Sequence, residues 1–131
     1  MNHTSPGWRH FHVSSFDRLV TSPLGTLVVL LAAAFLEAWG DSFFQSSFHR
    51  AAGMGRILTF VAGAAVLALY GSLVNVPRWE FGKLIGMYVA LFFFAAQVIA
   101  KVRFGESPTV PIYAGGALII SGGLLIALWH G

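Results

Sequence analysis

Apolar residues dominate four long stretches of the chain, and short segments rich in glycine, proline or charged residues separate them. Each stretch is close to the roughly 20 residues that a helix needs to cross the hydrocarbon core of a bilayer. We expect spanning helices at about 24–48, 57–74, 81–102 and 112–129. The pattern therefore predicts an all-α membrane protein, in which residues 23–131 form a four-helix transmembrane bundle.

Residues 1–22 are polar and mixed, and they differ from the apolar stretches that follow. Spacing of their large apolar residues favours a short interfacial helix that lies on the membrane, and a loosely ordered tail is the alternative. The first span is expected to start at Ser22-Pro23, because serine is a good N-cap and proline suits the first helical turn. The apolar side of the interfacial helix would consist of Trp8, Phe11, Phe16 and Leu19.

Composition agrees with a lipid environment. The chain is 56% hydrophobic and 10% charged, whereas soluble domains carry about 25% charged residues. It has no cysteine, which excludes disulfides, thiolate nucleophiles and cysteine-based metal sites. Its basic residues are dispersed among the connections rather than gathered on one face, so nucleic-acid binding is not expected. We find no phosphate loop, metal-ligand cluster or catalytic spacing, and expect neither an enzyme nor a cofactor.

The basic residues do not assign an orientation in the membrane. With four spans, four lysines or arginines fall on each side of the membrane, whereas the positive-inside rule needs an excess on one side. The chain is therefore a candidate for dual topology and for pairing as an antiparallel homodimer. The alternative is that the N-terminal tail or one arginine decides the orientation.

Two carboxylates, Glu37 and Asp41, lie within the first apolar stretch. A charged side chain at that depth costs about 2.5–3.5 kcal/mol on insertion scales, so an intramembrane acid indicates a functional site. Residues four apart lie on the same face of a helix, and two acids so close would not titrate independently. Gly40 beside them would let another backbone come close. We expect the rest of the chain to surround this acidic patch.

Several short motifs carry a resemblance to a known family. The segment 32–44 contains a glutamate, Glu37, followed three residues later by Gly40, and Phe48-His49-Arg50 closes the same span. A proline turn at 73–77 and a glycine-rich last span complete the set. With these motifs the chain resembles the small multidrug resistance-like transporters of the drug/metabolite transporter superfamily, and looks closest to their YnfA-type branch. The resemblance covers about residues 30–131.

The resemblance implies a role for particular residues. In that family the first-span glutamate is the shared site for protons and substrate, two copies face each other in an antiparallel dimer, and a third-span aromatic lines the cavity. This implies those roles for Glu37 and Tyr88. Independently of the resemblance, Asp41 and Trp39 are further candidates for substrate or proton binding, and Asp41 stands where the family usually has a small or hydroxyl residue. It also implies a bacterial inner membrane as the location.

Small residues and one tyrosine suggest how the later spans pack. Glycine pairs seven residues apart in the last span predict a close-packing stripe there, and Gly40 is a separate close-packing position in the first span. Such a stripe is either a dimer interface or an intramolecular contact. Tyr70 is interpreted as an interfacial aromatic near the end of the second span, and a cavity-facing position is the alternative. The glycine pairs are Gly115-Gly116 and Gly122-Gly123.

Two functions follow from these features. The first is proton-coupled transport of a small cationic or amphipathic organic solute, in which proton and cation compete for Glu37. The second is a non-transporting accessory or assembly subunit that docks on a larger membrane complex through its glycine faces. Purification as a homodimer would favour the transporter, whereas co-purification with unlike chains would favour the accessory subunit.

Overall fold

The computed structural model describes residues 15–75 and 80–129, without the side chains of Phe16, Asp17, Leu19 and Phe81. Every regular element in these two ranges is an α-helix, and four of the helices are long and apolar enough to span a membrane. The predicted all-α membrane class with four spans is therefore confirmed. The helices are α1 (Ser15–Thr21), α2 (Pro23–His49), α3 (Gly53–Asn75), α4 (Phe81–Phe104) and α5 (Val110–Leu128).

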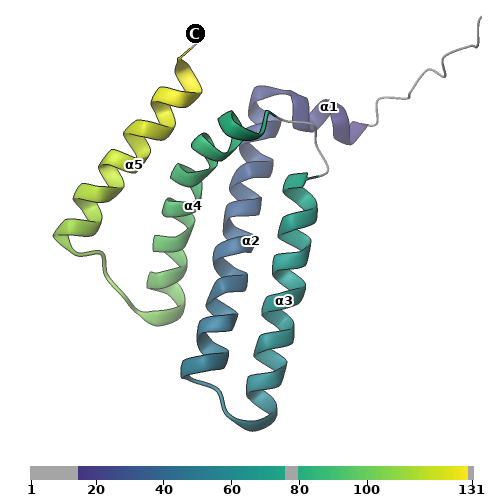
Figure 1. Ribbon diagram of the computed structural model, residues 1–131, viewed down its shortest axis with the longest axis vertical. Coiled ribbons are helices and arrows are strands. Elements are labelled where there is room, and N and C mark those ends of the chain that lie inside the picture. The colour runs from purple at the N-terminus through teal and green to yellow at the C-terminus, as the bar shows by residue number, and fades with distance from the viewer. Residues whose placement is uncertain (1–14, 76–79, 130–131) are drawn as a thin grey trace, which may run out of the picture.

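The four long helices alternate in direction, and their order in space differs from their order in the chain (Figure 1). Close backbone contacts join α2 to α3, α2 to α4, and α4 to α5. Across the molecule the order is therefore α3, α2, α4, α5, and among the described helices α5 has this backbone contact with α4 alone. The central position of α2 explains why the helix with the two acids is also the most buried of the four.

A sharp corner joins α1 to α2. Ser22 is the N-cap of α2, and its hydroxyl accepts a hydrogen bond of 3.1 Å from the backbone N–H of Gly25. The hydroxyl of Thr26 donates a bond of 2.6 Å to the carbonyl of Val20, whose side chain is buried. The predicted start of the first span is confirmed. Of the predicted interfacial segment, Trp8 and Phe11 lie outside the described residues.

Two glycines set helix boundaries that differ from the predicted ones. Gly53 has a φ of +55°, and α3 begins there, four residues before the expected start, so the first connection is shorter than expected. Gly105 has a φ of +70°, and its N–H bonds the carbonyl of Lys101 at 3.1 Å, which ends α4 two residues later than expected. In both places glycine allows a left-handed backbone that side chains disfavour.

Small residues bring α2 close to both of its neighbours. On the side toward α3, a Cβ added to Gly63 would lie 3.1 Å from the carbonyl oxygen of Gly40, so these two backbones are nearly in contact. Nearer its N-terminus, the buried residues of α2 are mostly alanines, and side chains of both α3 and α4 pack with them. Close approach of backbones replaces the hydrophobic effect as the source of packing between helices in lipid. The α2 residues of this core cluster are Leu30, Ala33, Ala34 and Ala38.

The glycine stripe of the last span is divided between two surfaces. Gly116 and Gly123 are buried against α4, where a Cβ on Gly123 would lie 2.6 Å from the Cβ of Ala90. Nothing lies within 4 Å of a Cβ added to Gly115 or Gly122. One glycine of each pair therefore serves packing within the chain, and the other is left on an open face of α5.

Candidate functional site

Glu37 lies about halfway along α2, at the place where α2 faces the first half of α4. Its side chain is half-buried, and its Oε2 atom accepts a hydrogen bond of 2.7 Å from the hydroxyl of Tyr88. Only 6% of Tyr88 is exposed, so the phenol is held firmly beside the carboxylate. Hydrogen bonds to a charged acceptor are the strong ones, and they orient the acceptor. The structure thus brings together two residues that the sequence singled out separately.

Aromatic rings surround this pair. Tyr70, from α3, stacks on Tyr88 with ring centroids 6.0 Å apart and planes inclined by 19°. Phe92, one turn after Tyr88 on α4, stacks on it at 6.4 Å. The phenol of Tyr70 is also close enough to Glu37 and to the Tyr88 hydroxyl to interact with both electrostatically. The carboxylate therefore sits where α2, α3 and α4 meet, beside Tyr88 and Tyr70, and Phe92 packs on the Tyr88 ring.

The position of Tyr70 corrects the favoured interpretation of that residue as an interfacial aromatic. It lies more than a turn before the end of α3 and packs against the core cluster that contains Tyr88. The spacing of Gly63, Leu67 and Tyr70 already indicated that Tyr70 lies on a packed face of α3. These residues are four and three positions apart, so they share one helix face. That face meets Gly40, one turn beyond Glu37, through Gly63 and Leu67.

Asp41 lies in a different environment from Glu37. It is exposed, and it lines a groove of about 160 Å³ between α2 and α4 whose described lining does not include Glu37. Polar side chains continue along this groove toward the connection between α4 and α5, namely Ser42, Gln45 and Glu106. The two acids therefore follow the same side of α2, but Glu37 is bonded to Tyr88, whereas Asp41 lines the groove, whose wall also includes Phe92.

Trp39 is the fourth candidate residue. Its side chain is 44% exposed, and it does not belong to the hydrophobic cluster around Tyr88. The structure therefore keeps Trp39 apart from the Glu37–Tyr88 pair within one chain.

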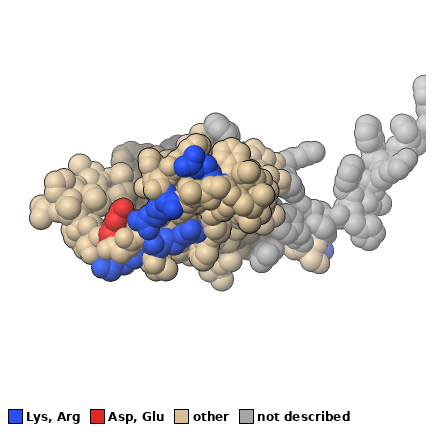
Figure 2. Space-filling view, turned by 90° about the horizontal axis from the view of Figure 1, so that it is seen from below, with Lys and Arg blue, Asp and Glu red and all other residues tan. Residues whose placement is uncertain are grey.

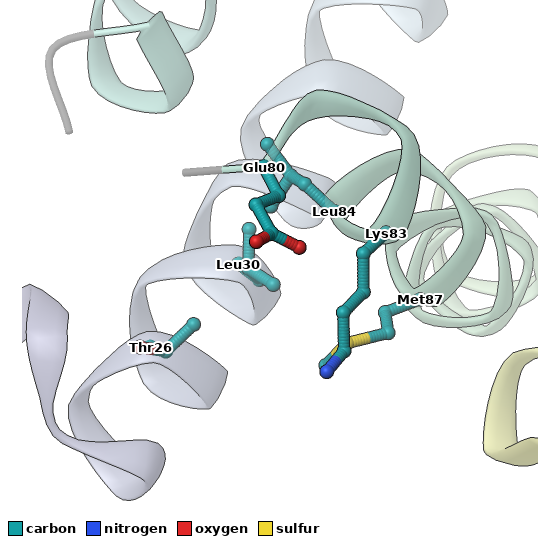
Figure 3. A pocket seen from close by; sticks show the side chains of 6 residues that line it. All are labelled: Thr26, Leu30, Glu80, Lys83, Leu84 and Met87. Atoms are coloured by element: carbon teal, nitrogen blue, oxygen red, sulfur yellow. The ribbon is translucent and has the colours of Figure 1, made fainter. Parts of the chain in front are cut away.

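A larger hollow of about 300 Å³ lies nearer the other end of the contact between α2 and α4 (Figure 3). Its lining includes one carboxylate, Glu80, and one ammonium group, Lys83. Leu30 and Leu84 form the apolar part of the wall, and both also pack in the cluster that holds Tyr88. Neither Glu37 nor Tyr88 is among the residues that line this hollow.

Within residues 15–75 and 80–129, no three His, Asp or Glu side chains lie close enough to hold a metal ion. Comparisons of the chain with protein-family models, curated proteins and solved structures gave no match. The four spans and the geometry around Glu37 are therefore the features of this protein that bear on its function.

Proposed function

We propose that this protein is a small integral-membrane transporter that exchanges protons for a small organic cation at Glu37. The observation that carries the proposal is the hydrogen bond from Tyr88 to a half-buried carboxylate inside a span. Acids within spans are costly and generally mark ion or substrate paths. The phenol orients the carboxylate without neutralising it, so the acid remains able to take either a proton or a cation.

The mechanism is a competition for one carboxylate. When Glu37 is ionised, it attracts the cation, and the hydroxyl of Tyr88, whose ring stacks between Tyr70 and Phe92, holds the carboxylate in place. When Glu37 is protonated, this attraction is lost and the cation leaves. Proton and cation therefore bind in turn, and moving the site from one side of the membrane to the other couples their opposite movements.

We also propose that the transporter works as a homodimer, antiparallel if the chain inserts in both orientations. In support, Gly115 and Gly122 leave an open small-residue track on α5, and small residues at such positions favour helix association in lipid. A bacterial inner membrane remains the location that the family resemblance implies.

The second candidate is an accessory or assembly subunit of a larger membrane complex. The observation in its favour is the large apolar surface of α3 and α5. Only 6% of the most apolar stretch of α3, and 11% of that of α5, is buried. In that case Glu37 would serve helix packing through Tyr88, and no proton would leave when a cation is added.

Proton release decides between these functions. The purified protein in weakly buffered detergent would be mixed with a lipophilic cation, such as tetraphenylphosphonium, and the pH change recorded. We expect the wild-type protein to release protons and Glu37→Gln to release none. The matched control is Glu80→Gln, which removes an exposed acid at the start of α4 and is expected to behave as wild type.

Unchanged proton release from Glu37→Gln would remove this residue from the mechanism. Mass analysis of the protein purified in a gentle detergent gives an independent test. A homodimer without other chains supports the transporter, whereas stoichiometric unlike subunits support the accessory role.

A further inference from the structure

Basic side chains gather at the end of the molecule where α2 and α4 finish and α3 begins. They are Arg50, Arg56, Lys101 and Arg103, and we refer to these four residues as the basic cluster. Figure 2, which views the molecule from this end, shows Lys and Arg side chains close together with a smaller acidic area beside them. The sequence distributes its basic residues evenly between the two sides, but folding concentrates these four on one surface.

The two central arginines are held by a reciprocal contact between α2 and α4. Arg50, which follows α2, places its Cζ 4.5 Å from the ring centroid of Phe104, at the end of α4. Arg103, on α4, places its Cζ 4.4 Å from the ring centroid of Phe43, on α2. A guanidinium stacked on a ring keeps its N–H groups free to bind at its edges. The two cations are thus fixed in place while most of their donors stay available.

Among the described residues, the polar contacts of the basic cluster are made with hydroxyl and carbonyl oxygens rather than with carboxylates. Arg103 Nη2 donates to the hydroxyl of Ser46 at 3.3 Å, and Lys101 Nζ donates to the hydroxyl of Ser107 at 2.8 Å. Arg56 Nε donates to the backbone carbonyl of Ser47 at 3.2 Å. In the part of the chain that the structure describes, no ion pair joins these four residues to an acid.

We propose that the basic cluster binds the phosphate of an anionic phospholipid headgroup. Arg50 follows the last residue of α2, and the other three basic residues lie in the first turn of α3 or the last turn of α4, so the cluster is at the level of the headgroups rather than in bulk water. Guanidinium groups bind phosphate oxygens in pairs, and basic pockets between spanning helices suit anionic headgroups. Such a lipid would bridge α2 and α4 at their ends and hold them together. The proposal does not depend on transport.

The test is lipid-dependent thermal stability of the full-length protein in detergent. Phosphatidylglycerol is compared with phosphatidylcholine of the same acyl chains, and inorganic phosphate at equal concentration is a third arm. We expect phosphatidylglycerol to raise the Tm by about 3 °C or more above the other two, because a ligand that binds only the folded state stabilises it. An equal effect of phosphatidylcholine would overturn the proposal, and an equal effect of phosphate would replace it with a small-anion site.

Charge-matched variants locate the effect. The double variant Arg50→Gln with Arg103→Gln should lose the shift, whereas Arg18→Gln with Lys83→Gln, which removes two charges elsewhere, should keep it. The proposal would be overturned if the first variant kept the Tm shift caused by phosphatidylglycerol, or if both double variants lost it equally. If the first variant does not fold, Lys101→Gln takes its place, because its contact is a single exposed hydrogen bond. We expect this variant to lose part of the shift, and an unchanged shift would contradict the proposal.

Discussion

The hydroxyl of Tyr88 donates a hydrogen bond of 2.7 Å to the carboxylate of Glu37, although 51 residues separate them in the chain. The bond joins the central helix α2 to α4, and the ring of Tyr70 brings α3 to the same place. An acid that costs free energy in the membrane is thus placed among polar hydroxyls rather than in lipid.

Glu37→Gln should weaken binding of a lipophilic cation far more than Asp41→Asn. An interaction with a charged group is worth about 1.5–3 kcal/mol, so removing it at Glu37 should lower the affinity by about tenfold or more. Asp41 is exposed in a separate groove, and we expect its loss to change the affinity by less than about threefold. Equilibrium binding of labelled tetraphenylphosphonium at fixed pH measures both. A larger effect at Asp41 would place the cation in the groove instead.

Tyr88→Phe should keep the fold but weaken the site. The substitution preserves the ring that stacks on Tyr70 and Phe92, while it removes the donor to Glu37. We expect a loss of about 1–2 kcal/mol in the free energy of unfolding, and several-fold weaker cation binding because the carboxylate is no longer oriented. Urea unfolding in detergent and cation binding report the two effects. Tyr113→Phe is the control, because that residue is 67% exposed on α5; equal effects of both substitutions would refute the role of Tyr88.

Gly63→Ala and Gly71→Ala should have opposite effects on stability. Alanine favours a helix over glycine by about 1 kcal/mol, and nothing lies within 4 Å of a Cβ at Gly71. At Gly63 the new Cβ meets the backbone of Gly40 at 3.1 Å, so α2 and α3 must move apart at a cost of about 1–3 kcal/mol. Thermal unfolding followed by circular dichroism measures both. A stabilised Gly63→Ala would show that the two helices separate easily.

Gly122→Leu should separate dimerisation from folding. Its Cβ points into open space, so the substitution is expected to leave the monomer stable and to weaken a dimer that uses this face of α5. Gly116→Leu should instead disturb the contact with Phe93 on α4 and lower the Tm. Crosslinking yield and thermal unfolding distinguish the two. An unchanged dimer in Gly122→Leu would place the interface elsewhere.

Much of the secondary structure was predictable from the sequence, because the forces that set it act locally. Burying an unpaired backbone group in lipid is so costly that a long apolar stretch has few choices besides a helix. The N-cap at Ser22 and the helix ends at glycine follow from backbone chemistry within a few residues. Boundaries were less accurate at Gly53, since a glycine that starts a helix and one that lies in a linker look the same in the sequence.

The sequence by itself determined that the chain has four membrane-spanning helices and an acid, Glu37, within one of them. Only the tertiary structure decided that Tyr88 and Tyr70 meet this acid, that one glycine of each pair in α5 faces α4, and that Arg50 and Arg103 cross between α2 and α4. In lipid, apolar side chains are tolerated on every face of a helix, so the hydrophobic pattern does not indicate which face packs inward. That choice depends on the fit between helices that are distant in the sequence.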